Sequence, residues 1–488
     1  MLSHPAQVAG VDSSTQGTKV LVVDADRGSA VCSGQAGHAV SAGMGRSESD
    51  PADWLRSLQE ALAQTGRAGE LAAVSVAGQQ HGLVCLSADR LPLRPAILWN
   101  DVRSGPWRER LVERLGGPSW WAGQLGSVPA TSFTVCHWAR LREVEPETAS
   151  ATRAVRLPHE FITEVLSGRP VGDRGDASGT GWWSPISNAY VPSVLESAEV
   201  GLDSGLLAEV LAEGEVAGPV TASSAGRFGL DPDCLVAQGT GDNMAAALGL
   251  ALRPGQVAMS LGTSGTAFTL SRTLAPDASG VVSGFADAQG GYLPLVCTLN
   301  CTRAIDRVAE WLGIDREAVE DGGRVVVLPF LDGERTPALP GAHGLVAGLD
   351  ADATRGQILW AAYLGAVVSL LDGIASLAAA SGGLAPAEGI LLVGGGGRSR
   401  AWRRAAAWLS ERPLLVPGPD DAALATARGA CAQAAAAWGG ASVADVLQSW
   451  PPLRVDTIEP MEGAGERLGE LREARSRLLE ASLTQLSG

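Results

Sequence analysis

Apolar runs separated by short polar turns divide the chain into strand-sized segments, and the clearest pattern occurs twice. Val8 to Asp24 predicts a β-hairpin, because two apolar strands flank a polar turn of hydroxyl groups, a glycine and a lysine. Val257 to Leu270 predicts a second hairpin, whose tip is rich in glycine and hydroxyl groups. Each hairpin opens one half of the chain, so the pattern predicts an internal repeat of two related domains that face each other across a cleft.

Other apolar segments predict further strands and helices. Ala72 to Ala77 and Ile390 to Val393 are strand-length apolar runs that end in glycine. Ile358 to Leu384 is long and apolar enough to suggest a membrane span, but Asp372 and several small residues favour a buried helix. Glu466 to Leu486 has the pattern of an amphipathic, charged helix. The mixture of strands and helices indicates an α/β fold.

Length and composition narrow the class of protein. The chain has 488 residues, more than a single hydrophobic core usually holds, so we expect an N-terminal domain over residues 1–244 and a C-terminal domain over residues 245–488. The formal net charge of −16, without a basic patch, argues against a nucleic-acid partner. Seven cysteines without a CxxC pair favour reduced thiols. No signal-peptide pattern is visible, so we expect a cytoplasmic protein without a membrane partner.

The stretch from Gln238 to Ala247 lies near the middle of the chain, where the two halves join. Gly239 and Gly241 allow a sharp turn and the close approach of a ligand. Asp242 and Asn243 follow, and a run of small residues then indicates the start of a helix. Asp242 has two interpretations, as the N-cap of an ordinary turn or as a carboxylate that faces a cleft. The hairpins on both sides favour the cleft.

The tips of the two hairpins carry groups that bind phosphate. In the first tip, hydroxyl groups, backbone N–H groups and an ammonium group can donate to phosphate oxygens, while Asp12 can hold a metal ion through water. The candidate phosphate-binding residues are Thr15, Gln16, Lys19, Gly262, Thr263 and Ser264. An ordinary polar turn is the alternative, and the GxxxxGK[ST] pattern is absent.

Two segments of the first half carry groups suited to a small polar ligand. Gln80 and His81 follow a strand, and His81 lies close to glycines, so a ligand or a purely structural role remains open. Trp99 to Arg103 combines an aromatic ring with an amide, a carboxylate and a guanidinium, a set suited to a sugar. Asp173 to Trp183 could line a pocket or form a turn with a tryptophan packed beneath it.

Four glycines, Gly394 to Gly397, connect a buried strand to a helix expected at Ala401 to Ser410. A flat nucleotide can lie against such bare backbone near a helix N-terminus. A linker is the alternative, and the strand and helix on either side disfavour it. We therefore expect Gly395, Gly396 and Gly397 to contact a nucleotide.

Seven pieces of the sequence, in this order and spacing, resemble the FGGY carbohydrate kinases of the actin/Hsp70-like ATPase superfamily. They are Gly10 to Lys19, Gly78 to Gly82, Leu93 to Asp101, Gly239 to Asn243, Leu261 to Gly265, Leu331 to Pro337 and Val393 to Gly397. The likeness runs nearly from end to end and is strongest to the members that phosphorylate D-xylulose. It implies two actin-like (ribonuclease-H-like) domains, with the sugar deep against the first and MgATP on the second.

The resemblance also implies roles for individual residues. Asp242 matches the general base, Asp12 the carboxylate near Mg²⁺, and Gln80, His81 and Asn243 the sugar contacts. The expected reaction transfers a phosphoryl group from ATP to D-xylulose and forms D-xylulose 5-phosphate. A kinase for ribulose, gluconate or glycerol is the first alternative, and an ATP-binding switch without transfer is the second. The sugar-suited groups argue against the switch, and a homodimer remains open.

Six positions depart from the usual pattern of the family. Glycine is common where this chain has Ser14, methionine where it has Gln80, lysine where it has His137, tryptophan where it has Arg140, an acidic residue where it has Leu364, and a small or amide residue near adenine where it has Arg400. These departures leave the kinase chemistry intact and bear on the preference for sugar and nucleotide.

Overall fold

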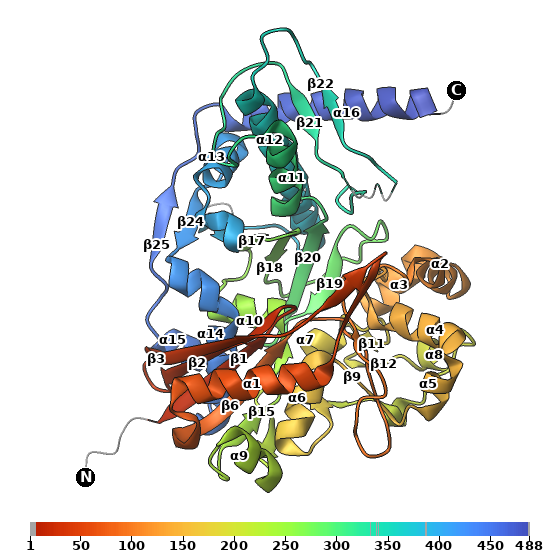
Figure 1. The fold of residues 1–488 in the computed structure, drawn as a ribbon, viewed down its shortest axis with the longest axis vertical. Helices are drawn as coiled ribbons and strands as arrows, with labels where there is room; N and C mark the ends of the chain where they lie inside the picture. Colours follow the sequence, from red (N-terminus) through yellow and green to blue (C-terminus); the bar gives the residue numbers. More distant parts are fainter. Residues whose placement is uncertain (1–5, 332, 338, 340, 386–387, 487–488) are drawn as a thin grey trace.

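The protein is represented by a computed structural model that describes residues 6–331, 333–337, 339, 341–385 and 388–486. Two seven-stranded mixed sheets form the centres of its two halves (Figure 1). The first sheet contains, in spatial order, β14 (Val216–Pro219), β15 (Leu235–Ala237), β6 (Leu71–Gly78), β1 (Gln7–Ser13), β2 (Gly17–Asp24) and β3 (Ala30–Gly37), with β16 (Thr240–Gly241) also paired to β6. The second contains β19 (Ser283–Ala286), β20 (Tyr292–Thr298), β18 (Gly265–Thr269), β17 (Val257–Leu261), β23 (Ile390–Val393), β24 (Leu414–Pro417) and β25 (Val455–Ile458).

The two sheets repeat one plan. In the first, β1 is antiparallel to β2 and parallel to β6, while β2 is antiparallel to β3 and β6 is parallel to β15. In the second, β17 is antiparallel to β18 and parallel to β23, while β18 is antiparallel to β20 and β23 is parallel to β24. The order β3-β2-β1-β6-β15 therefore matches β20-β18-β17-β23-β24 in position and direction. Both predicted hairpins are confirmed.

Helices cover the sheets and link the halves (Figure 1). Those of the first half are α1 (Pro51–Thr65), α2 (Gly105–Arg114), α3 (Gly117–Leu125), α4 (Thr134–Val144), α5 (Pro146–Ala151), α6 (Pro158–Ser167), α7 (Arg174–Ala177), α8 (Pro192–Leu195), α9 (Ala222–Phe228) and α10 (Asp242–Gly249). Those of the second half are α11 (Thr302–Leu312), α12 (Arg355–Ala380), α13 (Arg400–Leu409), α14 (Pro419–Gly439), α15 (Val443–Ser449) and α16 (Ala464–Leu486). Helices α2, α3, α4, α5 and α8 gather beside the first sheet and enclose an aromatic core.

Helix α14 comes from the second half of the sequence but packs on β1 and β6 of the first sheet and against α10. Glycines permit this close approach. A Cβ atom at Gly10 would lie 1.9 Å from the carbonyl oxygen of Ala427, and one at Gly429 would lie 1.9 Å from that of Ala245. The division between residues 244 and 245 stays a prediction, and it would pass through α10.

Short strands complete the structure outside the two large sheets. They are β4 (Ser41–Gly43), β5 (Arg46–Ser49), β7 (Val84–Leu86), β8 (Ala96–Ile97), β9 (Ala154–Arg156), β10 (Val171–Gly172), β11 (Trp183–Ser184), β12 (Ala189–Tyr190), β13 (Glu209–Val210), β21 (Val326–Leu328) and β22 (Leu345–Ala347). The apolar helix α12 is long enough to cross a bilayer, but 78% of its most apolar window is buried inside the protein. It packs against β18, β20, β21 and α13, so it is the core helix that the sequence predicts.

Candidate active site at the junction of the two halves

Asp242 lies at the start of α10, where β16 runs alongside the end of β6. Gly241 occupies the N-cap position, so Asp242 is the first helical residue and not the cap. The backbone N–H of Asn243 and its side-chain Nδ2 both donate to Oδ1 of Asp242, at 2.8 and 3.0 Å. Two donors on one carboxylate oxygen fix the orientation of the group and leave Oδ2 as the oxygen that can take up a proton.

Asp12, at the end of β1, is the second carboxylate of the site. Burial raises the pKa of Asp242 to about 8, and the negative charges of Asp12 and Asp176 add to this effect. Burial also raises the pKa of Asp12 to about 6, while Lys19 opposes the rise. A base whose pKa lies near neutrality is well matched to proton transfer at physiological pH. The described residues contain no group of three or more Asp, Glu, His or Cys side chains placed to hold a metal ion, so a hard cation such as Mg²⁺ would need water or phosphate oxygens to complete its coordination.

His81 lies in the left-handed region of backbone space, with φ of 66°. Its Nδ1 lies 2.7 Å from the carbonyl oxygen of Gly179. A carbonyl can only accept, so Nδ1 carries the hydrogen and Nε2 is left with a lone pair that can accept a hydroxyl group. Burial lowers the pKa of His81 to about 3, and the positive charge of Arg335 contributes, so the ring is neutral at physiological pH.

Aromatic rings from both halves hold His81 in place. Its ring stacks on Phe133, with centroids 4.9 Å apart and planes at 16°, and lies 5.5 Å from Phe285 on β19. Arg335, whose charge acts on His81, also belongs to the second half. The sequence predicts no role for Phe285, and it singles out Arg335 only as part of the piece Leu331 to Pro337, because no local pattern indicates contact with a histidine more than 200 residues away.

Gln80 and Asn243 are joined directly. Asn243 Nδ2 donates to Gln80 Oε1 at 2.8 Å, and the same nitrogen donates to Asp242. The structure therefore brings together Gln80, Asn243 and Asp242, three of the predicted sugar-site residues, in one hydrogen-bonded chain.

The segment around Trp99 braces the first hairpin. The indole N–H of Trp99 donates to the Thr15 hydroxyl at 3.0 Å. Asp101 is 1% exposed, accepts a hydrogen bond from the backbone of Ser47 at 2.9 Å and forms an ion pair with Arg103. Trp99, Asp101 and Arg103 of the segment expected to bind sugar thus all bond to other groups of the protein. The contact of Trp99 with a sugar stays a prediction.

The tip of the β1–β2 hairpin is tied to its neighbours. Lys19 Nζ donates to the carbonyl of Ala423 in α14 at 3.0 Å and lies 3.8 Å from Asp12 Oδ2. His38 Nε2 lies 3.1 Å from the carbonyls of both Ser14 and Thr15. These contacts hold the candidate phosphate-binding groups of the first half next to the acidic centre.

A cavity of about 520 Å³ lies at the end of β17 and the start of α13. Its lining residues are Leu261, Gly262, Thr263, Thr302, Arg316, Glu317, Gly395, Gly396, Arg398 and Ser399. The second hairpin tip and the glycine turn therefore meet in one cavity, as expected of a nucleotide site. Arg398 lines it and Arg400 does not; Arg400 is exposed at the first turn of α13, and the nucleotide contact expected of it stays a prediction. Thr302, Arg316 and Glu317 reach the cavity from a separate segment, and no local sequence pattern predicts them as part of the site.

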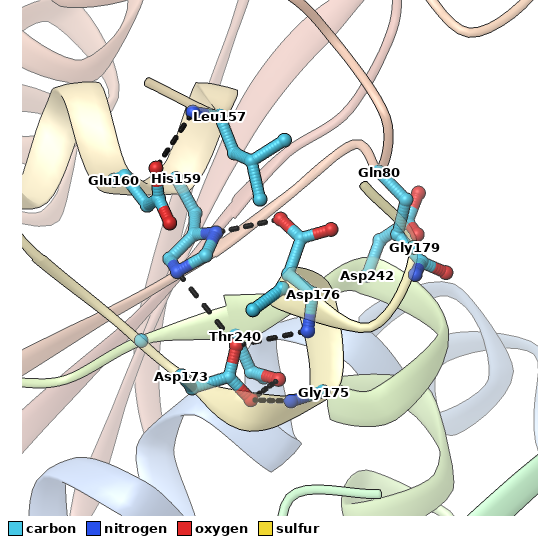
Figure 2. Close-up of polar contacts among 12 residues, drawn as sticks. Gln80, Leu157, His159, Glu160, Asp173, Gly175, Asp176, Gly179, Thr240 and Asp242 are labelled. Atoms are coloured by element: carbon cyan, nitrogen blue, oxygen red, sulfur yellow. Dashed lines mark hydrogen bonds and ion pairs between the residues drawn. The ribbon is translucent and has the colours of Figure 1, made fainter. Parts of the chain in front are cut away.

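A buried, charged cluster lies beside Gln80 and Asp242 (Figure 2). His159, Asp173 and Asp176 are all 0% exposed. Nδ1 of His159 lies 2.7 Å from Oδ2 of Asp176, and Asp173 Oδ2 accepts from the hydroxyl of Thr240 at 2.7 Å. Although burial opposes protonation, the neighbouring carboxylates raise the pKa of His159 to about 9, with Asp176 making the largest contribution. The segment around Asp176 was a candidate pocket, but the sequence did not connect it to His159.

Family models match both halves of the chain. The N-terminal domain of the FGGY family of carbohydrate kinases matches residues 7–249, and the C-terminal domain of that family matches residues 257–438. The chain belongs to the FGGY family of carbohydrate kinases.

Relatives of this FGGY kinase cover nearly its whole length. It is 53% identical to the xylulose kinase of Streptomyces coelicolor (strain ATCC BAA-471 / A3(2) / M145) over 477 residues, which is 97% of each chain. It is also 53% identical to the xylulose kinase of Streptomyces rubiginosus, over 95% of each chain. The crystal structure of xylulose kinase from Bifidobacterium adolescentis superposes with a TM-score of 0.81 at 33% identity and covers 96% of this chain and 99% of that one. The expected two-domain, actin-like α/β architecture agrees with this likeness.

The departures from the usual FGGY pattern have ordinary structural settings. Ser14 closes the first hairpin tip by donating its hydroxyl to Gly17 at 3.0 Å. His137 is 0% exposed and pairs with the Ser104 hydroxyl at 2.9 Å. Leu364 is 8% exposed in the core around α12, and Arg140 is 9% exposed. Gln80 alone among the six lies in the hydrogen-bonded chain that reaches Asp242.

Proposed function

We propose that the chain transfers the γ-phosphoryl group of MgATP to D-xylulose and forms D-xylulose 5-phosphate and ADP. The observation that carries the proposal is Asp242, a carboxylate with a pKa raised to about 8, which is hydrogen-bonded to Asn243 beside Gln80. The identity of the sugar is supported by the 53% identity to two Streptomyces proteins named xylulose kinase.

The proposed reaction follows from these positions. Asp242 takes the proton of the attacking primary hydroxyl, a bond forms between that oxygen and the γ-phosphorus, and the bond to the β-phosphate oxygen breaks to release ADP. His81 accepts a sugar hydroxyl at Nε2. The transition state is loose, so orientation of the hydroxyl by Asp242, Gln80 and Asn243 contributes more than removal of its proton.

The residues present fit ATP and Mg²⁺. The glycine-lined cavity of about 520 Å³ offers bare backbone, and the N–H group of Thr263 can donate to phosphate oxygens. Asp12 would hold Mg²⁺ through water, and the ion would neutralise charge on the phosphates. Burial raises the pKa of both Asp12 and Asp242, and neighbouring negative charges add to the rise at Asp242 alone; a bound cation would favour the ionised form of both carboxylates.

The test is sugar-dependent release of ADP across a panel of D-xylulose, D-ribulose, D-gluconate and glycerol. We expect D-xylulose to give the highest kcat/KM, with phosphorus NMR of the product confirming a 5-phosphate. A clear preference for another compound of the panel would replace D-xylulose and leave sugar or polyol kinase activity in place. ADP release that does not depend on any sugar would instead support an ATP-binding switch.

Two further expectations belong with this function. All seven cysteines are free, which is consistent with a reducing cytoplasmic environment. A homodimer is tested by light scattering of the purified protein with and without ATP, and a mass of one chain would contradict it.

A further inference from the structure

The carboxylate of Asp176 has one engaged oxygen and one that has no hydrogen-bond partner. Oδ2 pairs with His159 Nδ1 at 2.7 Å. Oδ1 is buried and accepts no hydrogen bond from the residues that the structure describes. Figure 2 shows this second oxygen turned away from His159, toward the side where Gln80 and Asp242 lie. A buried carboxylate oxygen without a donor is costly, so a donor is expected to face it.

Gln80 supplies a donor that meets this need. Its Nε2 is also buried without a hydrogen-bond partner among the described residues. Burial raises the pKa of Asp176, and the Gln80 side chain is among the neighbours that oppose this rise, so the amide lies beside the carboxylate. Its other end, Oε1, accepts from Asn243 Nδ2. An amide has one donating and one accepting end, whereas an ionised carboxylate only accepts. Asp176 therefore dictates which way the amide of Gln80 points.

The direction set at Gln80 passes to Asp242. With Oε1 of Gln80 facing Asn243, the Nδ2 group of Asn243 must turn toward Gln80, and it then also donates to Oδ1 of Asp242. If Gln80 were reversed, two NH₂ groups would face each other. Asn243 would have to turn its oxygen toward Gln80 or lose the contact.

The turn that carries Asp176 is itself held firmly. Asp173 accepts from the backbone N–H groups of Gly175 and Asp176, at 2.9 and 3.1 Å, and from the hydroxyl of Thr240 two residues before Asp242. The same turn presents the carbonyl of Gly179 to His81. One short segment of the first half thus orients both Gln80 and His81.

We propose that Asp176, held by His159, is a positioning residue of the kinase site, which orients the Gln80 amide and through it presents Asn243 to Asp242. This inference rests on the proposed function, since it concerns the same acidic centre. It assigns to Asp176 no contact with sugar, ATP or metal, and its effect reaches the reacting atoms only through Gln80 and Asn243.

A polarity swap tests the proposal. In Asp176→Asn, the new side chain accepts from His159 and turns its NH₂ group toward Gln80, which forces the amide to reverse. We expect kcat/KM for D-xylulose to fall about 30-fold, with KM for ATP within about twofold of the wild type. In Gln80→Glu alone, kcat/KM for D-xylulose should fall by a similar factor, because two carboxylates then face each other.

The double variant Asp176→Asn with Gln80→Glu restores the pattern. The new amide donates to one oxygen of the new carboxylate, and the other oxygen accepts from Asn243. We expect kcat/KM to recover to within about fivefold of the wild type, a coupling that independent losses would not produce. Glu160→Gln is the matched control, because Glu160 is buried in the same cluster but pairs with the backbone of Leu157, away from Gln80 (Figure 2). Its kcat/KM should stay within about twofold.

Side-chain amide hydrogen exchange, followed by NMR, gives a second readout that needs no substrate. Exchange at the Asn243 amide should speed up in each single variant and return to the wild-type rate in the double variant. A double variant no better than the poorer single variant in both readouts overturns the proposal, as does an equal loss in Glu160→Gln. If the wild type does not phosphorylate D-xylulose, the proposed function fails, and the exchange rates alone decide the role of Asp176.

Discussion

The hairpins β1–β2 and β17–β18 occupy equivalent positions in their sheets, yet their surroundings differ. Beside the first hairpin lie ionisable side chains, with Asp12 and Asp176 close enough to Asp242 that their charges raise its pKa. Beside the second lies an open cavity bordered by glycines, among them Gly262, Gly395 and Gly396. The two sheets therefore share one topology, but ionisable side chains lie beside the first hairpin and glycine backbone borders the cavity beside the second.

The difference fits the two proposed tasks, proton transfer and sugar recognition in the first half and nucleotide binding in the second. Taking up a proton and distinguishing sugar hydroxyls require groups with a defined charge and a defined donor or acceptor end. Holding phosphates and a flat base requires N–H groups and space, which glycine provides. We therefore expect the first half to be sensitive to the exchange of single polar atoms and the second to the addition of single carbon atoms.

The largest effect is expected from Asp242→Asn. Asparagine is nearly isosteric and still hydrogen-bonds a hydroxyl, but it cannot accept a proton at neutral pH. We expect kcat for D-xylulose to fall about 10²-fold or more, with sugar and ATP binding within a few-fold. A folded variant that retains more than about a third of the wild-type kcat would exclude the general-base role.

Thermal melting provides the control for this variant, and the direction of the change in melting temperature can also be predicted. The pKa of Asp242 is raised in the folded state to about 8, so its ionisation favours the unfolded state as pH rises from about 4 to 8. Asparagine removes this loss of stability. The melting temperature of Asp242→Asn should therefore equal or exceed that of the wild type at pH 7, and the gap should be smallest near pH 4. Helix capping does not interfere, because Gly241 is the N-cap.

His81→Ala is expected to have the next largest effect. Loss of the Nε2 acceptor leaves a sugar hydroxyl unpaired and costs about 1–3 kcal/mol in kcat/KM for the sugar, with little change in KM for ATP. The pKa of His81 is lowered to about 3, so KM for the sugar should show no histidine titration between pH 5 and 8. Steady-state kinetics across this range check both statements. Equal losses in sugar and ATP use would make the histidine structural, and His343→Ala, at an exposed histidine, is the comparison.

Local patterns predicted the elements well. Ile390 to Val393 is the observed strand β23, because strong apolar residues are bounded by glycine. The long helix was expected from Ile358 to Leu384 but spans Arg355–Ala380. Thr354 caps it by accepting from the backbone of Gln357 at 3.1 Å, while the Gln357 side chain accepts from the backbone of Thr354, also at 3.1 Å. This reciprocal capping adds polar residues that an apolar pattern does not include.

The candidate site was predictable only where its residues are neighbours in sequence. Asp242 and Asn243 could be predicted because they lie in a glycine-containing turn before a helix. Gln80 and His81 could be predicted because they follow the end of a strand. The pairing of His159 with Asp176 and the influence of Arg335 on His81 depend on tertiary packing between distant segments. Trp99 is a mixed case: its sequence pattern predicts a sugar contact, which stays a prediction, and did not indicate the hydrogen bond that its indole N–H donates to Thr15.

Gly395→Val is expected to have the smallest effect, and it tests the second half of the chain, where backbone borders the cavity. Gly395 lines the nucleotide cavity, and a Cβ atom there would meet no protein atom within 4 Å. The added side chain should therefore leave the melting temperature unchanged and occupy space that ATP needs, raising KM for ATP about tenfold with KM for the sugar within about twofold. Gly396→Ala is the contrasting variant, because its Cβ atom would lie 2.7 Å from Leu261 Cβ and 2.9 Å from Thr302 Cγ2. The Gly396→Ala protein should have a lower melting temperature than the wild type, so a change in its KM for ATP could not be assigned to the nucleotide site alone. A folded Gly395→Val protein with an unchanged KM for ATP would place the nucleotide elsewhere. It would contradict the idea that the first half acts through polar side chains and the second through glycine backbone.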